Sequence, residues 1–304
     1  MGADHPSSRS EATPNPAHAG GTAAAWALTF NAFVWGVSWW PFRQLQAAGV
    51  HPLWATAFIY ILCVVVLMLT HRTAVVELLR TPSLWVLVVA AGVTNAAFNW
   101  AVTLGDVVRV VLLFYLMPVW AVVLARLVLK EAVTGPALAR VALALAGAMI
   151  VLGGGTTGVP WPTSSMDWLA ILGGFSFALN NVMLRHQMHR SAASRTLAMF
   201  VGGAALAAAA AFALRHHGVA LPPPLATAWV GGAAALGLAF LLANLALQYG
   251  ASRLSAHATA VIMLTEVFFA SASAWLLGAA QFDARLLLGG ALIVTAALLA
   301  AWRH

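Results

Sequence analysis

One acidic residue lies in the middle of a long apolar stretch in the second half of the chain. Glu266 falls within VIMLTEVFFASASAWLLGAA, residues 261–280. A charge at the centre of a bilayer costs about 2.5–3.5 kcal/mol on insertion scales, so a carboxylate at this place needs a partner or a task. We expect it to face a central cavity, where it binds substrate or carries a proton. A neutral acid hydrogen-bonded between helices is the alternative.

Asparagines form a second polar set within apolar stretches, at Asn31, Asn95, Asn99, Asn180, Asn181 and Asn244. Asn95 and Asn99 are four residues apart and therefore share one helix face. An amide in hydrocarbon seeks a partner, and hydrogen bonds between membrane helices contribute about 0.6 kcal/mol on average. For each amide, bonding between helices and lining a wet cavity are both open. We expect that some members of the set line a cavity.

The segment FNAFVWGVSWWPFRQL, residues 30–45, carries three tryptophans and an amide in apolar surroundings. Asn31, Trp35 and Trp39 follow the spacing i, i+4, i+8 and share one stripe of a helix, which makes them a candidate substrate wall. Trp40 fits an aromatic belt at the membrane interface, and Arg43 fits a side chain that reaches back to water. The alternative is that the tryptophans of the stripe only fill helix contacts.

Asp106 and Arg109 are three residues apart at the start of another apolar stretch. This spacing permits a local ion pair, and an acid near a helix N-terminus suits the helix dipole. An outer gate that touches substrate is the alternative. The sequence has no metal-ligand cluster and no G-x-S-x-G, and GGGTTG at 153–158 lacks the Lys-Ser/Thr of a phosphate-binding loop. We therefore expect no metal, no cofactor and no catalytic site.

The elements that position these side chains are expected to be membrane helices. The 304 residues are 62% hydrophobic and only 8% charged, whereas a soluble domain carries about 25% charged residues. A membrane helix needs about 20 mostly apolar residues. We expect ten spans, at 23–43, 52–70, 84–104, 107–129, 136–154, 167–186, 194–214, 227–249, 256–277 and 285–302. The polar residues 1–22 are predicted to be a disordered tail.

The Lys and Arg residues between the spans predict the orientation. With the N-terminus in the cytoplasm, four of the 15 fall outside, at Arg43, Arg109, Arg215 and Arg285, and eleven fall inside. Both termini are therefore predicted to be cytoplasmic. Because these basic residues are scattered singly, the net charge of +7 does not indicate nucleic-acid binding.

The two halves of the sequence resemble each other. A shift of 142 residues lays WALTFNAFVWGVSWWPFR (26–43) over WLAILGGFSFALNNVMLR (168–185), and a shift of 145 lays NWAVTLG (99–105) over NLALQYG (244–250). Chance likeness of apolar helices is the alternative. A true repeat gives two five-span units, 23–154 and 167–304, joined by a linker at 155–166. An odd number of spans makes the units insert with opposite orientation, and the first shift sets Gly173, Phe177 and Asn181 against the Asn31 stripe.

Ten spans in two five-span repeats resemble the EamA-type transporters of the drug/metabolite transporter superfamily. The fourth span, LLFYLMPVWAVVLARLVLKE (112–131), is similar to that family's pattern of a mid-helix proline and a glutamate at the cytoplasmic end, filled here by Pro118 and Glu131. The ninth span resembles the second-repeat version through Glu266. It departs from that pattern at Val267, where proline is usual, and at Ala280, where the terminal glutamate would fall.

The sequence thus predicts an all-α membrane protein with ten transmembrane helices as two inverted five-helix repeats. We expect a secondary transporter that exports a small organic metabolite, an amino acid or a similar compound, across the inner (plasma) membrane. A multidrug or nucleobase-like efflux carrier, an intramembrane enzyme and a non-transporting scaffold are the alternatives. The expected partners are the substrate, the lipid bilayer and, as a candidate coupling ion, the proton; a monomer suffices and a homodimer is open. The candidate substrate-binding residues are Asn31, Trp35, Trp39, Asn95, Asn99, Tyr115, Phe177, Asn181, Asn244 and Glu266.

Overall fold

The computed structural model describes residues 16–130, 132–152, 162–225, 227–251, 253–254, 259, 262–281 and 284–301. Within these ranges the chain forms helices and turns and no strand. Residues 1–15 of the predicted tail, residues 155–161 of the predicted linker and Glu131 lie outside the described residues. The predicted all-α class is confirmed for the described part of the chain.

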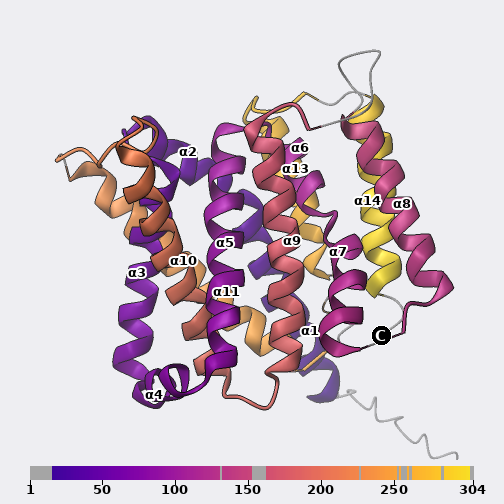
Figure 1. The fold of residues 1–304 in the computed structure, drawn as a ribbon, viewed down its shortest axis with the longest axis horizontal. Helices are drawn as coiled ribbons and strands as arrows, with labels where there is room; N and C mark the ends of the chain where they lie inside the picture. Colours follow the sequence, from indigo (N-terminus) through magenta and orange to yellow (C-terminus); the bar gives the residue numbers. More distant parts are fainter. Residues whose placement is uncertain are drawn as a thin grey trace, which may run out of the picture.

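The helices follow one another along the chain with short connections (Figure 1). The first half contains α1 (Pro16–Val37), α2 (Trp39–Ala47), α3 (Pro52–Thr70), α4 (Arg72–Arg80), α5 (Pro82–Leu104), α6 (Val107–Phe114), α7 (Met117–Leu124), the π-helical turn η1 (Ala125–Leu129) and α8 (Gly135–Leu152). The second half contains α9 (Ser165–His186), α10 (Ala192–Arg215), α11 (Ala228–Ala251), α13 (Thr265–Leu276) and α14 (Ala284–Ala301).

Six helical stretches in the described ranges are long and apolar enough to cross a bilayer. They are Pro52–Thr70, Pro82–Leu104, Val107–Val128, Ser165–His186, Ala192–Arg215 and Ala228–Ala251, and two shorter apolar helices run over Gly135–Val151 and Ala284–Ala296. Six of the predicted spans, 52–70, 84–104, 107–129, 167–186, 194–214 and 227–249, coincide with these helices to within a few residues. The first predicted span, 23–43, is instead divided between α1 and α2. The count of ten spans stays a prediction, because the described residues contain six helices of full length, and residues 256–258 and 260–261 of the ninth span lie outside the described part.

Local sequence explains where several of these helices begin. Pro52 and Pro82 open α3 and α5 at positions where no backbone N–H is needed. Ser164 and Asp167 form a capping box at the start of α9, in which each side chain accepts a hydrogen bond from the backbone N–H of the other residue. The spans therefore start at defined residues.

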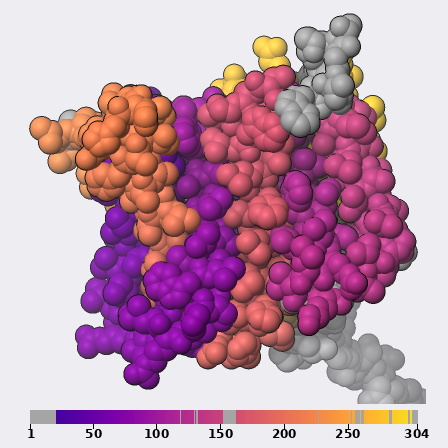
Figure 2. All heavy atoms as spheres, viewed as in Figure 1, coloured from indigo at the N-terminus to yellow at the C-terminus, as the bar shows by residue number. Residues whose placement is uncertain are grey.

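The long helices close into a ring in which neighbours come mostly from different halves of the chain. Going round, α1 packs on α11, α11 on α3, α3 on α10, α10 on α5, α5 on α9, α9 on α6 and α7, α6 on α13, and α13 on α1. Exchanging the halves, so that α1 replaces α9, α3 replaces α10, α5 replaces α11 and α6 replaces α13, reproduces this order. The predicted two-repeat organisation is therefore visible in the order of packing. In Figure 2 the salmon-coloured atoms of α9 lie between those of α5 and α7, which shows the interleaving.

Two further helices, α8 and α14, pack on each other at one side of the ring (Figure 1). Their contact is reciprocal: a Cβ on Gly147 would lie 2.6 Å from the carbonyl oxygen of Gly289, and a Cβ on Gly289 would lie 2.7 Å from that of Gly147. The two glycines are separated by the 142 residues of the first sequence shift. Small residues let membrane helices approach closely, and this pair does so at equivalent positions of the two halves.

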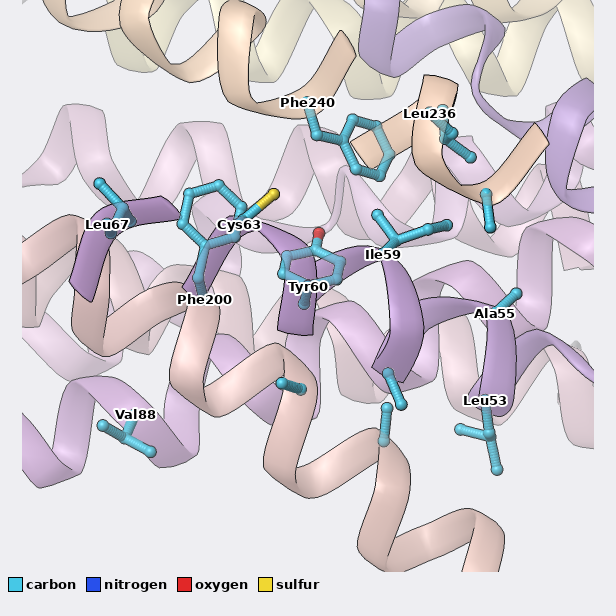
Figure 3. Close-up of a cluster of buried hydrophobic side chains, with 14 of the residues drawn as sticks. Leu53, Ala55, Ile59, Tyr60, Cys63, Leu67, Val88, Phe200, Leu236 and Phe240 are labelled. Atoms are coloured by element: carbon cyan, nitrogen blue, oxygen red, sulfur yellow. The ribbon is translucent and has the colours of Figure 1, made fainter. Parts of the chain in front are cut away.

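The largest buried cluster lies at the opposite side of the ring, where α3, α10 and α11 meet (Figure 3). Tyr60 of α3 contacts the rings of Phe200 and Phe240 at centroid distances of 5.3 and 6.0 Å. Ile59 and Cys63 complete the α3 face of this cluster. Because the buried Tyr60 ring also packs against Gly203, α10 comes close to α3 along this face.

Candidate functional site

The fourth span is broken at mid-length. Helix α6 ends at Phe114, Tyr115 and Leu116 form a turn, and α7 begins at Met117. Pro118 is the second residue of α7 and has no backbone N–H to continue the ladder of α6. The turn is irregular backbone within a span, which is tolerated at membrane depth where protein or a water-filled cavity surrounds it.

The ninth span breaks at the equivalent place without a proline. Leu264 is the N-cap of α13, and its carbonyl accepts a hydrogen bond from the N–H of Val267 at 3.1 Å, just as Leu116 accepts one from Val119 at 2.9 Å. The hydroxyl of Thr265 donates to the carbonyl of Ile262 at 2.6 Å and so competes for a backbone acceptor of the preceding turn. The kink that the family pattern assigns to proline therefore forms here with Val267 in its place.

Tyr115 and Glu266 meet where the two breaks face each other. The tyrosine hydroxyl donates to Oε2 of Glu266 at 3.3 Å. Tyr115 is buried and Glu266 is partly exposed. Glu266 lies in the first turn of α13. Of the acidic residues that the structure describes, which are Glu77, Asp106, Asp167 and Glu266, it is the one at mid-span.

Helix α1 closes on this contact from the side. A Cβ on Gly36 would lie 2.8 Å from the carbonyl oxygen of Glu266 and 2.8 Å from the Cβ of Phe269, so the two helices pack backbone to backbone. Phe33 adds an edge-to-face contact with Phe269 at 5.4 Å. The site therefore joins three elements from both halves, namely α1, the break after α6, and α13.

The predicted stripe Asn31–Trp35–Trp39 is divided by a bend at Ser38, whose hydroxyl bonds the carbonyl of Trp35 at 2.8 Å. Asn31 and Trp35 face α11. The Nδ2 of Asn31 donates to the carbonyl of Ala243 at 2.7 Å, and Trp35 stacks on Phe240 with centroids 4.4 Å apart. After the bend, Trp39 faces α13.

Trp39 is buried, and its indole Nε1 donates to the hydroxyl of Ser273 at 2.9 Å. The guanidinium of Arg43 lies over the same indole ring, 4.9 Å from its centroid. The tryptophan is thus held at its edge by α13 and over its ring by its own helix, α2.

Asn95 and Asn99 of α5 both reach α3, as expected for residues on one helix face. The hydroxyl of Tyr60 donates to Oδ1 of Asn95 at 2.6 Å. The Nδ2 of Asn99 donates to the hydroxyl of Thr56 at 3.1 Å, and its Oδ1 is buried without a partner in the described part of the chain. At these positions the structure favours hydrogen bonding between helices.

Phe177, Asn181 and Asn244 occupy three different surroundings. Phe177 contacts Phe114, the last residue of α6, at a centroid distance of 5.2 Å. Asn181 is exposed, whereas its neighbour Asn180 is buried with an Oδ1 that lacks a partner in the described residues. The Oδ1 of Asn244 accepts from Nε2 of Gln248 at 3.0 Å.

The end of the bundle that holds the start of α6 is tied by two arginines. Arg109 donates from Nε and Nη2 to both carboxylate oxygens of Asp167 at 2.9 Å each, and from Nη1 to the carbonyl of Val151 at 3.1 Å. Asp106 accepts from the backbone N–H of Arg109 at 2.7 Å. The expected local pair of side chains is therefore replaced by a helix cap and a bridge from α6 to α9 and α8.

Arg43 makes the second tie at this end. It donates from Nε to the carbonyl of Thr103 at 3.0 Å and from Nη2 to that of Gly105 at 2.6 Å. These are unpaired carbonyls at the C-terminus of α5, which a basic side chain commonly satisfies. Arg43 therefore fixes α2 to α5 in addition to lying near the predicted interface.

The sequence profile of the EamA-like transporter family matches residues 22–153 and 164–302. The chain belongs to the EamA-like transporter family. Membership indicates a membrane transporter of small molecules and confirms the resemblance seen in the sequence. Among solved structures, one described only as the crystal structure of a protein superposes with a TM-score of 0.56 at 18% identity, over 92% of this chain and 96% of that chain. This likeness concerns the fold alone. A comparison with characterised proteins finds no match.

In this transporter, three of the predicted residues gather around the broken helices: Tyr115 and Glu266 bond each other, and Phe177 packs on the end of α6. Trp39 joins them through α13. Asn31 and Trp35 contact α11, Asn95 and Asn99 contact α3, and Asn244 is engaged by Gln248. Asn181 is exposed on α9 and no contact brings it to the group.

Sequence reasoning missed several residues of this EamA-like site. Ser273 holds Trp39, and Phe240 carries the stacked ring of Trp35. Gly36 sets the approach of α1 to Glu266. A hydroxyl in the apolar run 261–280 was a signal for Ser273, whereas a phenylalanine or a glycine in a membrane helix carries no signal of its own. Among the described residues no group of His, Cys, Asp or Glu side chains is arranged to hold a metal ion.

Proposed function

We propose that the protein is a secondary transporter that exports a small organic metabolite, an amino acid or a comparable compound, across the inner (plasma) membrane by alternating access. In this proposal the chain crosses the membrane ten times with both termini in the cytoplasm. One observation carries the proposal: Tyr115 and Glu266 meet at the breaks of two spans, one from each half of the chain.

Broken helices with a carboxylate at mid-span support a binding site at that place. Discontinuous helices at the interface of two inverted repeats commonly hold the substrate and coupling ions of secondary transporters. An ionisable residue within the membrane faces the bundle interior or a wet cavity. Glu266 is partly exposed, while its partner Tyr115 is buried. A substrate amine or a proton could therefore reach the carboxylate and displace the tyrosine hydroxyl.

The pseudo-symmetric ring supports alternating access. When two halves with equivalent packing exchange their conformations, a site open to one side becomes open to the other. The bridges of Arg109 to Asp167 and of Arg43 to the end of α5 lie at the end that the charge distribution assigns to the outside. In this proposal they close the outer end and must separate, at least in part, when the site opens outward.

Glu266 at the site, and the unsatisfied amide oxygens elsewhere in the helix bundle, favour a substrate rich in hydrogen-bond donors. The one mid-span acid among the described residues is Glu266, and an ammonium group would complement it. The Oδ1 atoms of Asn31, Asn99 and Asn180 are buried acceptors without a partner in the described part of the chain. Acceptors without donors suit a primary amine more than a carboxylate or a phosphate.

The aromatic side chains favour one competing substrate class. Trp35 stacks on Phe240, and Phe177 packs on Phe114. Planar rings of this kind could hold a drug or a nucleobase-like substrate by stacking. The same transport assay separates this class from amino acids.

The test is a flux assay in proteoliposomes with a panel of amino acids, amines, nucleobases and cationic dyes, each with and without a pH gradient. We expect saturable flux of an amino acid or another amine. Glu266→Gln should lower the initial rate at least tenfold, because a hydrogen bond to a charged group contributes about 1.5–3 kcal/mol. Tyr115→Phe should lower the rate as well, whereas the control Tyr249→Phe, on the exposed side of α11, should leave it unchanged.

Three results would count against the proposal. If no compound shows saturable flux, the proposal that the protein transports small metabolites is wrong. Flux of nucleobases or dyes alone would favour the competing substrate class. Unchanged flux and unchanged pH dependence in Glu266→Gln, at normal protein abundance, would remove Glu266 from the mechanism. Right-side-out and inside-out vesicles, compared directly, test the export direction.

A further inference from the structure

A depression of about 470 Å³ lies beside α4, and α4 is at the end of the bundle opposite to α2 and α6 (Figure 1). Its walls come from α4, the residue that follows α4, and the connection between α9 and α10. The lining residues are Thr73, Val76, Glu77, Arg80, Thr81 and Arg190. It is separate from the broken helices, and the transport proposal does not use it.

The charges in this depression leave a surplus of positive charge. Glu77 is occupied by hydroxyl groups, since Ser194 and Ser191 donate to its Oε2 at 2.5 and 2.8 Å. These hydrogen bonds, with a smaller contribution from the charge of Arg190, hold the pKa of the Glu77 carboxyl below its ordinary value. With Arg80 and Arg190 both cationic and Glu77 anionic, the lining carries a net charge of +1.

Arg190 has unused hydrogen-bonding capacity. Its Nη1 is 3.8 Å from Oε1 of Glu77, which is an ion-pair distance but too long for a hydrogen bond. Its Nε is buried and has no partner in the described part of the chain. A buried donor without an acceptor costs free energy, so the guanidinium of Arg190 is not saturated by protein partners in the described part of the chain.

Helix α4 has the composition of a helix that lies at a membrane surface. It connects two membrane spans, α3 ending at Thr70 and α5 beginning at Pro82. Ala74 and Leu78 are buried against the bundle, whereas Val76 and Leu79 are 48% and 65% exposed. Arg80 shares the exposed face with them. Apolar side chains reaching toward acyl chains beside an arginine reaching toward headgroups are typical of an interfacial helix.

We infer that this depression binds the headgroup of an anionic phospholipid of the cytoplasmic leaflet. The phosphate would be held by the guanidinium groups of Arg80 and Arg190, with the hydroxyl of Thr73 within the same lining. The acyl chains would lie against Val76 and Leu79. A net charge of +1 matches a phosphatidylglycerol-type headgroup, whose net charge is −1, and not a zwitterionic one. Arginine suits the phosphate because its planar fork pairs two oxygens at once.

Binding of lipid to the delipidated full-length protein in a neutral detergent tests this inference. The probes are dioleoyl phosphatidylglycerol, dioleoyl phosphatidylcholine and inorganic phosphate, and the readouts are the dissociation constant by native mass spectrometry and the shift in melting temperature. We expect phosphatidylglycerol to bind about thirtyfold more tightly than phosphatidylcholine, because each of the two arginines raises the affinity for an anionic headgroup about fivefold. Inorganic phosphate should produce no shift at matched concentration.

The variants locate the site. Arg80→Gln with Arg190→Gln should abolish the preference for phosphatidylglycerol. The control Arg126→Gln with Arg140→Gln removes the same charge from the same end of the bundle and should retain the preference. Should the double variant fold poorly, Arg80→Gln alone, at an exposed position, should lose about fivefold in affinity. Equal binding of both lipids to the wild type, equal loss in both double variants, or a shift with inorganic phosphate alone would overturn the inference.

Discussion

The contact between α5 and α10 offers a direct test of the packing, through Gly202. A Cβ at this position would overlap the carbonyl oxygen of Val88 and would lie 2.9 Å from the carbonyl carbon of Val88 and 3.0 Å from the amide nitrogen of Gly92. Carbon atoms in favourable contact are about 3.5–4.0 Å apart. Because the obstructing atoms belong to the backbone of α5, they cannot turn aside as a side chain can. Gly202→Ala must therefore push the two helices apart.

The magnitude follows from two opposing effects. Overpacking of a tight contact costs about 1–3 kcal/mol, and the backbone clash places Gly202→Ala at the upper end of that range. Alanine in place of glycine within a helix returns up to about 1 kcal/mol. The net loss is about 2 kcal/mol. At Gly231 on α11 an added Cβ meets no atom within 4 Å, so Gly231→Ala should only gain the stability that alanine gives a helix. The two variants should thus differ by about 3 kcal/mol.

A third glycine completes the series. Gly237 is the counterpart of Gly92 in the second half, and a Cβ there would lie 3.1 Å from Cδ2 of Leu62 and 3.3 Å from the carbonyl oxygen of Ile59. Gly237→Ala should fall between the other two variants. Unfolding by titration with sodium dodecyl sulfate in mixed micelles, followed by tryptophan fluorescence, gives the midpoint for each. If Gly202→Ala unfolds at the same midpoint as Gly231→Ala, the close approach of α5 and α10 is wrong.

Other side chains give further predictions that the same titration can check. Asp167→Asn should lower the free energy of unfolding by about 2 kcal/mol, since its buried carboxylate accepts two bonds from Arg109; a loss that persists in the background of Arg109→Gln would show that the bridge is not its cause. Burial lowers the pKa of His51 to about 4; its ordinary value is about 6.5, so the unfolded chain takes up the proton first as the pH falls below 6.5. Lowering the pH from 7 to about 5 should therefore cost about 2 kcal/mol, and His51→Asn, which retains a capping acceptor, should remove that dependence. Trp39→Phe should cost about 1 kcal/mol through the lost bond to Ser273, with Ser273→Ala costing nothing more in that background.

Much of the architecture could be predicted, because the length and hydrophobicity of apolar segments identify membrane spans. The limits of α3 and α10 follow from apolar runs that end at Thr70 and Arg215. The repeat was visible as a shift of 142 residues, and the same separation brings Gly147 against Gly289 in the structure. The limits of the spans and the repeat follow from the order of residues along the chain, so a single sequence is enough to find them.

The candidate site was less predictable because helical periodicity assumes a straight helix. The stripe of Asn31, Trp35 and Trp39 is real only up to the bend at Ser38, after which the last tryptophan faces another partner. A rotation of 100° per residue also means that a shift by one residue changes the face of a helix. Asn180 is buried and Asn181 exposed for that reason.

Pairings between distant residues were also beyond the sequence. Arg109 has Asp106 at the ideal local spacing, yet its guanidinium binds Asp167, because the start of α9 lies against the start of α6. The break before Glu266 forms without proline through Thr265 and its hydroxyl. In both cases the deciding atoms come from tertiary or backbone geometry, which residue spacing does not contain.

The interleaved ring has a consequence for how the protein is made. Asn31 of α1 finds its acceptor on Ala243, which lies 212 residues later in the chain. At synthesis rates of about 5–20 residues per second, Ala243 leaves the ribosome roughly 10 to 40 s after Asn31 does. The side chain of Asn31 lacks this acceptor during that time. During that time the first half of the chain exposes to lipid the surfaces meant for α10, α11 and α13. The contacts between the two halves therefore form late, after the second half has been synthesised and inserted. Until then the first half must not form stable contacts with other membrane proteins.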